Sequence, residues 1–366
     1  MFLELVLDSK KDCKGCKVQN TYNGEIFTLY GSVILASGGM SGLFPGHCTG
    51  TVENDTCVAS TVFSQGVKLG NLEFIQYHPT TVRISGKQYL ISEAARSEGG
   101  RFYILRNGKP WYFLEDLYGE NGNLLSRDQV VKEIWNVQRR EDCEKTVYLD
   151  MRGIPSDEWD NRLFGMRDIC IEYLGQDPKK EPIPIQSGMH YFMGGILVDK
   201  NHRTNLKHLY AAGECACIYH GASRLGGNSL LGAVYGGYIA AKSALEEAIE
   251  PVGEVKKESG ELLRKDEYLS KEIGDILRKS MDVIRDEASL KEGYEKILKL
   301  HQEGNLPFVE KNKVVLGLAM LQSAIDRKES RAAHVRIDYP EMKEAFRKVT
   351  VSQYDGKKVH VWFEEP

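Results

Sequence analysis

The sequence has no long apolar run. No stretch of its 366 residues approaches the roughly 20 consecutive apolar residues that a membrane-spanning helix needs. The first residues, MFLELVLD, resemble a strand and lack the basic region and small-residue cleavage site of a signal peptide. We therefore expect a cytoplasmic protein, which could lie peripherally at the inner face of a membrane only through partners.

Neither sign of charge is in large excess. Lysine and arginine number 48 against 52 aspartate and glutamate, which gives a formal net charge of −4. The short basic runs have acidic neighbours and read as solvated surface, so the chain lacks the basic footprint of nucleic-acid binding. We expect no nucleic acid among its partners.

The eight cysteines show no regular spacing. A reducing compartment therefore fits better than a disulfide scaffold. Cys13 and Cys16 are the one pair with metal-like spacing, but a metal site needs further ligands nearby. We predict a plain hairpin there, with Lys14-Gly15 at its tip, and no metal site.

The pattern of apolar residues indicates a mixed α/β (α+β) fold of two or three domains. Residues 2–37 alternate as in a small antiparallel meander, with Asn23-Gly24 as a hairpin turn. The last run, Val33–Gly39, reads as a buried strand that ends on two glycines where the backbone approaches something closely. We expect residues 1–77 and 191–250 to form one domain.

A long insert, residues 78–190, interrupts this domain and has helical periodicity around Arg127–Ile134. Such an insert is expected to be a capping, substrate-binding domain. Residues 255–328 are amphipathic at helical spacing, which predicts a bundle of three antiparallel helices. The C-terminal segment, residues 329–366, follows this bundle.

Five short stretches carry ionisable side chains, and four of them also contain glycine or proline. They are QYHPT (76–80), SEAARSEGG (92–100), SRD (126–128), HYFMGGI (190–196) and HGASRLGGNSLLG (220–232). Each alone has a structural explanation, such as a turn, a surface ion pair on a helix or a charge at a helix N-terminus. Their candidate ligands are two histidines (His78 and His190), three arginines (Arg96, Arg127 and Arg224) and the hydroxyl of Ser92, a set suited to a small dianion such as a dicarboxylate.

These stretches, together with LYAAGE (209–214) and ESRAAHVRIDYP (329–340), occur in the same order in a known family. The chain resembles the flavoprotein subunits of succinate dehydrogenase and fumarate reductase, whose architecture the L-aspartate oxidases share. The resemblance runs from about residue 2 to residue 350. Seven ordered motifs are far more specific than one glycine-rich loop.

The resemblance implies a flavin-dependent interconversion of fumarate and succinate. Arg127 stands where the family has its proton-transferring arginine, and Glu93 and Arg96 match a relay that exchanges this proton with solvent. The positions that bind the carboxylates of a C4-dicarboxylate in the family are here His78, Ser92, His190 and Arg224.

The resemblance also implies FAD as the cofactor, because no side chain carries a hydride. Glu214 matches the family residue that hydrogen-bonds the flavin ribityl region. Backbone amides at Ser229 and Leu230 match those beside the pyrimidine edge of the flavin, where the start of a helix would stabilise the anionic reduced ring. The other expected cofactor positions are Ser37, Gly38, Gly39 and Tyr191.

One family element has no counterpart in this sequence. The strand, G-x-G-x-x-G turn and helix that hold the FAD pyrophosphate in the family are absent. Either the chain is a fragment or a second chain supplies this FAD-binding segment, and the chain alone should bind FAD poorly. Smaller departures, Ser92 for a common threonine and Ser223 for a common asparagine, preserve polar side chains.

Three functions stay open at this stage. Met193 and the Gly226-Gly227 pair favour a fumarate reductase or succinate dehydrogenase, with an iron–sulfur or other electron-transfer subunit as partner. An L-aspartate oxidase or a reductase of another unsaturated carboxylate is the second reading. A flavin-free, non-catalytic partner subunit that keeps the fold is the third.

Overall fold

A computed structural model describes residues 1–51, 54, 56–91, 93–250 and 253–366. The chain folds into two compact units, which are described separately below. Unit 1 comprises Met1–Pro45, Gly50–Ile75 and Tyr191–Pro366, and unit 2 comprises Gly46–Thr49 and Gln76–His190. In the described part of the chain, no helix is long and apolar enough to cross a membrane.

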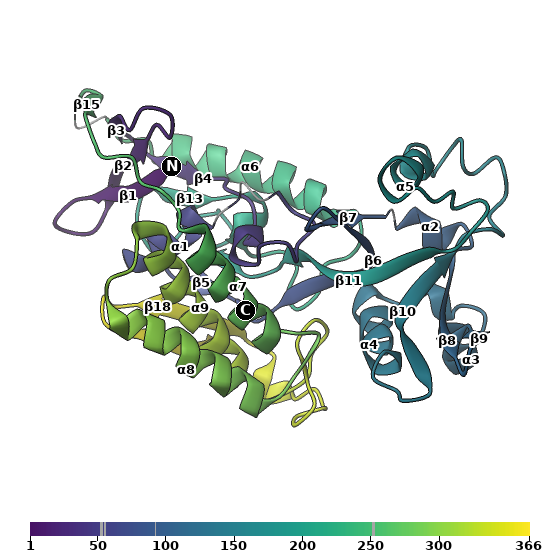
Figure 1. The fold of residues 1–366 in the computed structure, drawn as a ribbon. Helices are drawn as coiled ribbons and strands as arrows, with labels where there is room; N and C mark the ends of the chain where they lie inside the picture. Colours follow the sequence, from purple (N-terminus) through teal and green to yellow (C-terminus); the bar gives the residue numbers. More distant parts are fainter. Residues whose placement is uncertain (52–53, 55, 92, 251–252) are drawn as a thin grey trace. The chain divides into compact units, whose positions relative to one another are not determined.

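Unit 1 contains most of the chain (Figure 1). Its first sheet has the order β1-β2-β3-β15, a second has the order β14-β12-β5-β18-β19, and two strand pairs, β13-β4 and β16-β17, complete it. The strands are β1 (Phe2–Leu7), β2 (Cys13–Gln19), β3 (Ile26–Tyr30), β4 (Val33–Leu35), β5 (Leu69–Gly70), β12 (Gly195–Leu197), β13 (Leu209–Ala211), β14 (Ala216–Cys217), β15 (Lys256–Glu258), β16 (Ile284–Arg285), β17 (Val335–Arg336), β18 (Val349–Tyr354) and β19 (Val359–Glu364).

The helices of unit 1 include the three expected near its C-terminal end. The α-helices are α1 (Cys57–Ser64), α6 (Asn228–Glu246), α7 (Glu267–Ser280), α8 (Glu287–Glu303) and α9 (Phe308–Asp326), and the short 3-10 turns are Ser41–Leu43, Gly213–Cys215 and Glu344–Phe346. Asp266 and Asp286 cap α7 and α8, each accepting a hydrogen bond from a first-turn amide. Helix α9 is buried along most of its length, and α7 and α8 pack against it (Figure 1).

Unit 2 is built on one six-stranded sheet of order β7-β6-β11-β10-β8-β9. Its strands are β6 (Ile75–Ile84), β7 (Lys87–Leu90), β8 (Arg101–Arg106), β9 (Lys109–Trp111), β10 (Cys143–Asp150) and β11 (Ile183–Phe192), and its helices are α2 (Ala94–Ser97), α3 (Phe113–Tyr118), α4 (Arg127–Val137), α5 (Met166–Leu174) and a 3-10 turn (Gly122–Leu124). Asn107-Gly108, both at positive φ, forms the tight β8–β9 turn that this dipeptide favours.

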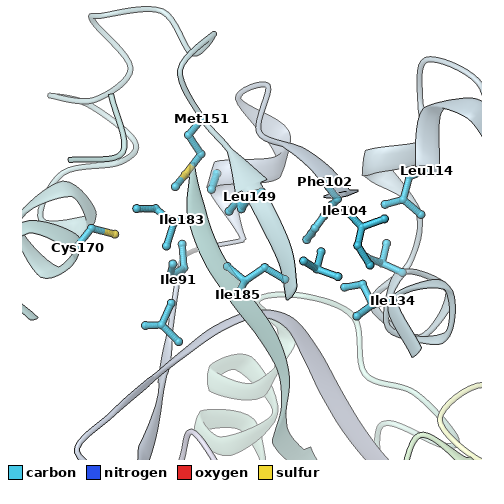
Figure 2. Packing of buried hydrophobic residues seen from close by; sticks show 14 of the residues in the cluster. Ile91, Phe102, Ile104, Leu114, Ile134, Leu149, Met151, Cys170, Ile183 and Ile185 are labelled. Atoms are coloured by element: carbon cyan, nitrogen blue, oxygen red, sulfur yellow. The ribbon is translucent and has the colours of Figure 1, made fainter. Parts of the chain in front are cut away.

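The core of unit 2 lies between the sheet and its helices (Figure 2). Alternate side chains of the strands are buried, as in Phe102 and Ile104 on β8 and Leu149 on β10. They pack with Ile134 of α4 in one cluster. This packing fixes α4, whose first residue is Arg127.

The predicted meander is confirmed, but its first turn was placed wrongly. Residues 2–30 form antiparallel β1, β2 and β3, and Gly24, at φ 77°, lies in the β2–β3 turn. The prediction of a hairpin tip at Lys14-Gly15 is wrong, because both residues lie inside β2. A Cβ on Gly15 would lie 1.9 Å from the Leu29 carbonyl oxygen, so this glycine permits close strand approach.

The actual β1–β2 turn is made by Asp8. Its Oδ1 accepts hydrogen bonds from the amides of Lys10 and Asp12, at 2.9 and 3.0 Å.

Among the residues that the structure describes, no cluster of three His, Cys, Asp or Glu side chains is arranged to hold a metal ion.

The run at Val33–Gly39 also differs from the expectation of a buried strand. Only Val33–Leu35 is a strand, and Ile34 within it is 41% exposed. This strand, β4, pairs in parallel with β13, from residues about 175 positions later in the chain, rather than with the meander. In the part of the chain that the structure describes, these two strands form a sheet of their own.

Candidate active site

Glu93 is the centre of a cluster of charged side chains in unit 2. Its Oε2 accepts from His78 Nε2 at 3.1 Å and from Arg127 Nε, and its Oε1 accepts from Arg96 Nε at 3.0 Å and from Arg96 Nη2. His78 is fully buried, and the side chains of Arg96 and Arg127 are 7% and 10% exposed. The Glu93 side chain is 31% exposed, so it is the member with the most contact with solvent.

Arg127 is held at the start of α4 by local sequence. Ser126 caps the helix, because its side chain accepts from the Gln129 amide while the Gln129 side chain accepts from the Ser126 amide. Arg96 Nη1 donates to the carbonyl oxygens of Asn123 and Leu125, both at 3.1 Å, which fixes the approach to this cap. The position of Arg127 therefore depends on a helix cap and on its partner arginine.

Gln76 is a member of the cluster that sequence reasoning did not single out. Its Oε1 accepts from Arg127 Nη1 at 3.1 Å. Gln76 and His78 are two residues apart on β6, so strand alternation places them on one face. The period-two pattern of QYHPT could have identified it.

The hydrogen bonds around His78 define its neutral tautomer. The Thr80 amide donates to Nδ1 at 3.2 Å, so Nε2 carries the proton that is donated to Glu93. Burial lowers the pKa of His78 from 6.5 to about 4, assisted by the positive charge of Arg127 and opposed by the bond to Glu93. His78 is thus a neutral donor near pH 7.

Glu93 stays ionised in this setting. Burial acts to raise its pKa, but the hydrogen bond from His78 and the charge of Arg96 act in the opposite direction, and the net effect holds the pKa well below its ordinary value. The ionised carboxylate is therefore the common acceptor of His78, Arg96 and Arg127.

His190 lies near this cluster at the other end of the insert. Its ring packs edge-on against His78, with centroids 5.1 Å apart, and its Nδ1 is hydrogen-bonded to Thr49 Oγ1 at 2.7 Å. Thr49 is 141 residues away from His190, and no sequence signal singled it out. Unit 2 therefore brings together five of the predicted residues, which are His78, Glu93, Arg96, Arg127 and His190. Ser92 lies outside the described residues.

The remaining predicted residues belong to unit 1. They are Ser37, Gly38, Gly39, Tyr191, Glu214, Arg224, Ser229 and Leu230. Arg224 is 5% exposed, and its guanidinium lies over the ring of Tyr191, 4.4 Å from the centroid. The ring of His220 meets Tyr191 edge-on at 5.3 Å, so the turn before α6 is anchored on this tyrosine.

Glu214 lies directly against Gly39 in unit 1. Its Oε1 accepts from the Phe192 amide at 3.1 Å, and a Cβ on Gly39 would lie 2.2 Å from the same oxygen. Burial raises the pKa of Glu214 to about 7, against smaller lowering effects of the Phe192 amide and Arg224. Near neutral pH this carboxyl group can accept or donate a hydrogen bond, as a ribityl hydroxyl requires.

The N-terminus of α6 suits the acceptor edge of a flavin ring. Gly227 at φ 80° begins the helix, and the described residues provide no side-chain cap and no acidic residue in the first turn. First-turn amides, here those of Ser229 and Leu230, lack intrahelical acceptors and carry the positive end of the helix dipole. These groups, with Glu214 and the Gly38-Gly39 turn, fit the ring and ribityl portion of FAD.

Comparison with known proteins identifies the family of the chain. A family model described as an FAD binding domain matches residues 1–230, and one described as the fumarate reductase flavoprotein C-terminus matches residues 310–365. The chain belongs to the succinate dehydrogenase and fumarate reductase flavoprotein family. FAD is therefore the cofactor of this family. The mixed helix-and-strand structure confirms the predicted α/β (α+β) fold class.

The chain is also similar to individual proteins of this family. The chain is 36% identical over 380 residues to the succinate dehydrogenase flavoprotein subunit of Bacillus subtilis, covering 93% of this chain and 65% of that protein. It is 36% identical over 334 residues to L-aspartate oxidase of Pyrococcus furiosus, covering 89% and 64%. A solved E. coli quinol fumarate reductase matches with a TM-score of 0.82 at 25% identity, covering 100% and 70%. The chain thus spans about two thirds of the length of these flavoproteins.

Proposed function

We propose that this chain provides the substrate-binding and proton-transferring parts of an FAD-dependent enzyme that interconverts fumarate and succinate. The observation that supports this most strongly is the single carboxylate, Glu93, bonded to His78, Arg96 and Arg127. Such a cluster can hold and move one proton at a partly solvated position. The proteins of this family are oxidoreductases, which agrees with the proposed reaction.

The reaction adds a hydride and a proton across one carbon–carbon double bond. FAD, when bound, supplies or accepts the hydride. Arg127 gives the proton to the other alkene carbon during reduction and takes it back during oxidation. The overall change, fumarate plus hydride plus proton to succinate, then balances.

A guanidinium is a weak acid, with an ordinary pKa above 12. Arg127 is 10% exposed and shares its carboxylate partner with a second guanidinium, Arg96. Protons return to Arg127 through Glu93, which is the most exposed member of the cluster.

The other predicted residues orient the substrate. We assign Arg224 of unit 1 and His190 of unit 2 each as a ligand of a substrate carboxylate, because a polarised carboxylate makes the adjacent alkene a better hydride acceptor. His78 and Ser92 complete the carboxylate contacts, and Tyr191 holds Arg224 in place through the stacking contact. Glu214, Ser229 and Leu230, with the turn Ser37–Gly39, contact the cofactor.

The test is spectroscopic. The chain, supplied with FAD and any missing FAD-binding segment, should show a flavin spectrum that succinate bleaches and fumarate restores. A flavin-loaded protein whose spectrum responds to neither acid would contradict the proposal. A colourless protein under the same conditions would instead favour the flavin-free reading.

An L-aspartate oxidase is the second candidate, because the relative from Pyrococcus furiosus has the same identity to this chain, 36%, over a shorter alignment than the succinate dehydrogenase subunit. The two functions differ in the substrate that reduces the flavin. A panel of succinate, L-aspartate and other saturated dicarboxylates, each mixed with the oxidised protein, separates them. Bleaching by L-aspartate and not by succinate would favour the oxidase.

We propose one partner on the basis of an exposed apolar surface of unit 1, formed by α6 and β4 and called the α6–β4 face. Helix α6 exposes large apolar side chains at helical spacing, which are Leu230, Leu231, Val234, Tyr235, Tyr238 and Leu245. Beside it, within the described residues, β4 has β13 as its one strand partner. A two-stranded parallel sheet is rarely stable uncovered. The fitting occupant is a strand–turn–helix segment that adds a parallel strand to β4 and binds the FAD pyrophosphate.

A second partner is an electron-transfer subunit, such as an iron–sulfur protein, which would connect the flavin to the donor or acceptor. The matched E. coli structure is a quinol fumarate reductase, whose name gives a quinol as electron source. By analogy, the present chain would lie in the cytoplasm, peripherally at the membrane through such a partner. Purification of the complex from its native source and identification of the bound subunits would test this.

A further inference from the structure

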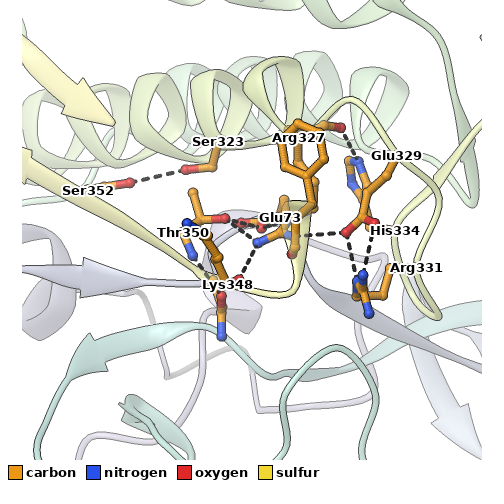
Figure 3. Close-up of polar contacts among 12 residues, drawn as sticks. Glu73, Ser323, Arg327, Glu329, Arg331, His334, Lys348, Thr350 and Ser352 are labelled. Carbon is orange, nitrogen blue, oxygen red and sulfur yellow. Dashed lines mark hydrogen bonds and ion pairs between the residues drawn. The ribbon is translucent and has the colours of Figure 1, made fainter. Parts of the chain in front are cut away.

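A buried ionic network in unit 1 lies outside the residues considered so far. Figure 3 shows Arg327 between Glu73 and Glu329, with Arg331 on the far side of Glu329. The distances are 2.5 Å from Arg327 Nε to Glu73 Oε1, 2.9 Å from Arg327 Nη1 to Glu329 Oε1, and 2.7 Å from Arg331 Nε to Glu329 Oε1. Glu73, Arg327 and Glu329 have no exposed surface, so each of these charges depends on its partners.

The network fixes a tight turn at Arg331–His334. The amide of Arg331 donates to the His334 carbonyl at 2.7 Å, and the amide of His334 donates back to the Arg331 carbonyl at 2.9 Å. Ala332 within the turn has φ 47°, a left-handed conformation that is sterically unfavourable for alanine. Such strain persists where the surroundings over-determine the backbone, and this is common at functional sites.

His334 connects the turn to the rest of unit 1 through hydrogen bonds. Arg285 Nη1 donates to His334 Nδ1 at 2.9 Å, so Nε2 carries the proton and donates to the Arg327 carbonyl at 3.1 Å. The ring is fully buried and meets Phe74 edge-on, with centroids 6.1 Å apart. Arg285 Nη1 also donates to the Glu73 carbonyl, at 2.7 Å, which connects the histidine to the same network.

The turn contacts the segment that carries Arg224. The Ala333 amide donates to the Ala222 carbonyl at 3.3 Å, two residues before Arg224. Ala333 also packs in one cluster with Phe74, Tyr191 and Met193, against which Ala222 lies. Tyr191 is the ring beneath the Arg224 guanidinium.

We propose that His334 is a positioning residue: it holds the Arg331–His334 turn, which in turn fixes the His220–Arg224 segment and so sets the affinity for a dicarboxylate. The claim that His334 orders the His220–Arg224 segment concerns the backbone alone, while the claim about dicarboxylate affinity rests on the proposed function. Nothing else in the roles proposed above uses His334.

The first experiment measures hydrogen–deuterium exchange of residues 219–225 in the full chain. His334→Ala should speed exchange in this segment at least about tenfold relative to the wild type. Ser323→Ala is the matched control, because Ser323 is equally buried and its bond to Ser352 Oγ, 3.0 Å, belongs to α9 and β18 rather than to the turn (Figure 3). Equal exchange in His334→Ala and Ser323→Ala would overturn the positioning role, whatever the reaction proves to be.

The second experiment uses the flavin-loaded assembly and fumarate. His334→Ala should raise KM about tenfold and change kcat by less than about twofold, because the turn acts on ground-state placement of a binding arginine. His334→Gln, which can still donate to the Arg327 carbonyl, should recover part of the affinity and also serves if His334→Ala does not fold. Faster exchange with an unchanged KM would overturn the link to substrate affinity while leaving the fumarate activity itself demonstrated.

Discussion

At the scale of single residues, the most informative group is the Glu214 carboxyl. Its pKa is raised by burial to about 7 in the folded chain, against an ordinary value of 4.5. A raised carboxyl pKa means that the folded state holds the proton more tightly than the unfolded chain does. The associated stability is present below pH 4.5 and is lost as the pH rises through 7.

Glu214→Gln should therefore flatten the pH dependence of stability. The wild type should lose up to about 3 kcal/mol of unfolding free energy between pH 5 and pH 8 from this group, at 1.36 kcal/mol per pKa unit, and the variant should lose none of it. Urea unfolding of both proteins at the two pH values checks this. Parallel pH profiles for the wild type and the variant would show that Glu214 does not titrate in this range.

Some residues of the candidate site could be predicted from the sequence, and others could not. The cluster of His78, Glu93, Arg96 and Arg127 comes from three motifs within about fifty residues, so short-range patterns were enough to suggest it. The Thr49 partner of His190 was not predicted, because a single threonine 141 residues away carries no pattern. Gly15 was assigned to a turn since the sequence does not distinguish a turn glycine from one that admits a neighbouring strand.

At the scale of secondary structure, the N-terminal cap of α4 affects both the stability of this helix and the position of Arg127. Ser126 forms the capping box, and the next residue is Arg127. Ser126→Ala should cost about 1 kcal/mol of unfolding free energy, the usual loss of a helix N-cap. Because fraying displaces Arg127, we also expect kcat for fumarate reduction to fall about fivefold to tenfold.

The matched control is Asp286→Ala, which removes the N-cap of α8, where the Asp286 side chain accepts from the Ser289 amide at 2.8 Å. It should cost a similar free energy of unfolding and leave kcat unchanged. Thermal melts and steady-state rates on the two variants decide the matter. A similar loss of kcat in both would attribute the effect of Ser126→Ala to general destabilisation.

Most elements followed from local sequence, but their pairing did not. Alternation and the Asn23-Gly24 turn predicted the meander, and amphipathic spacing predicted the helices of residues 255–328, because these signals act over a few residues. The parallel pairing of β4 with β13, and the ion pair between Glu73 and Arg327 across 254 positions, depend on long-range packing. Periodicity carries no information on such partners.

At the scale of the whole molecule, we predict that the α6–β4 face of unit 1 binds a separate FAD-binding segment. Val234→Ser combined with Tyr238→Ser should weaken binding of a strand–turn–helix FAD-binding segment, and with it FAD, by at least about tenfold, because two large apolar side chains would no longer be buried. Flavin titration in the presence of the segment measures this.

Phe164→Ser is the control for that prediction, since Phe164 is 83% exposed and belongs to unit 2. It should leave flavin affinity unchanged. Undiminished flavin affinity in the Val234 and Tyr238 variant would contradict the assignment of this face.

The central claim, proton transfer by Arg127, is tested most directly by Arg127→Ala in the flavin-loaded assembly. The kcat for fumarate reduction should fall by at least about a hundredfold, the usual minimum contribution of a general acid, while the flavin spectrum stays unchanged. Arg140→Ala, which removes an exposed arginine paired with Asp142, should retain full activity. Turnover of Arg127→Ala within a few-fold of the wild type would contradict the account.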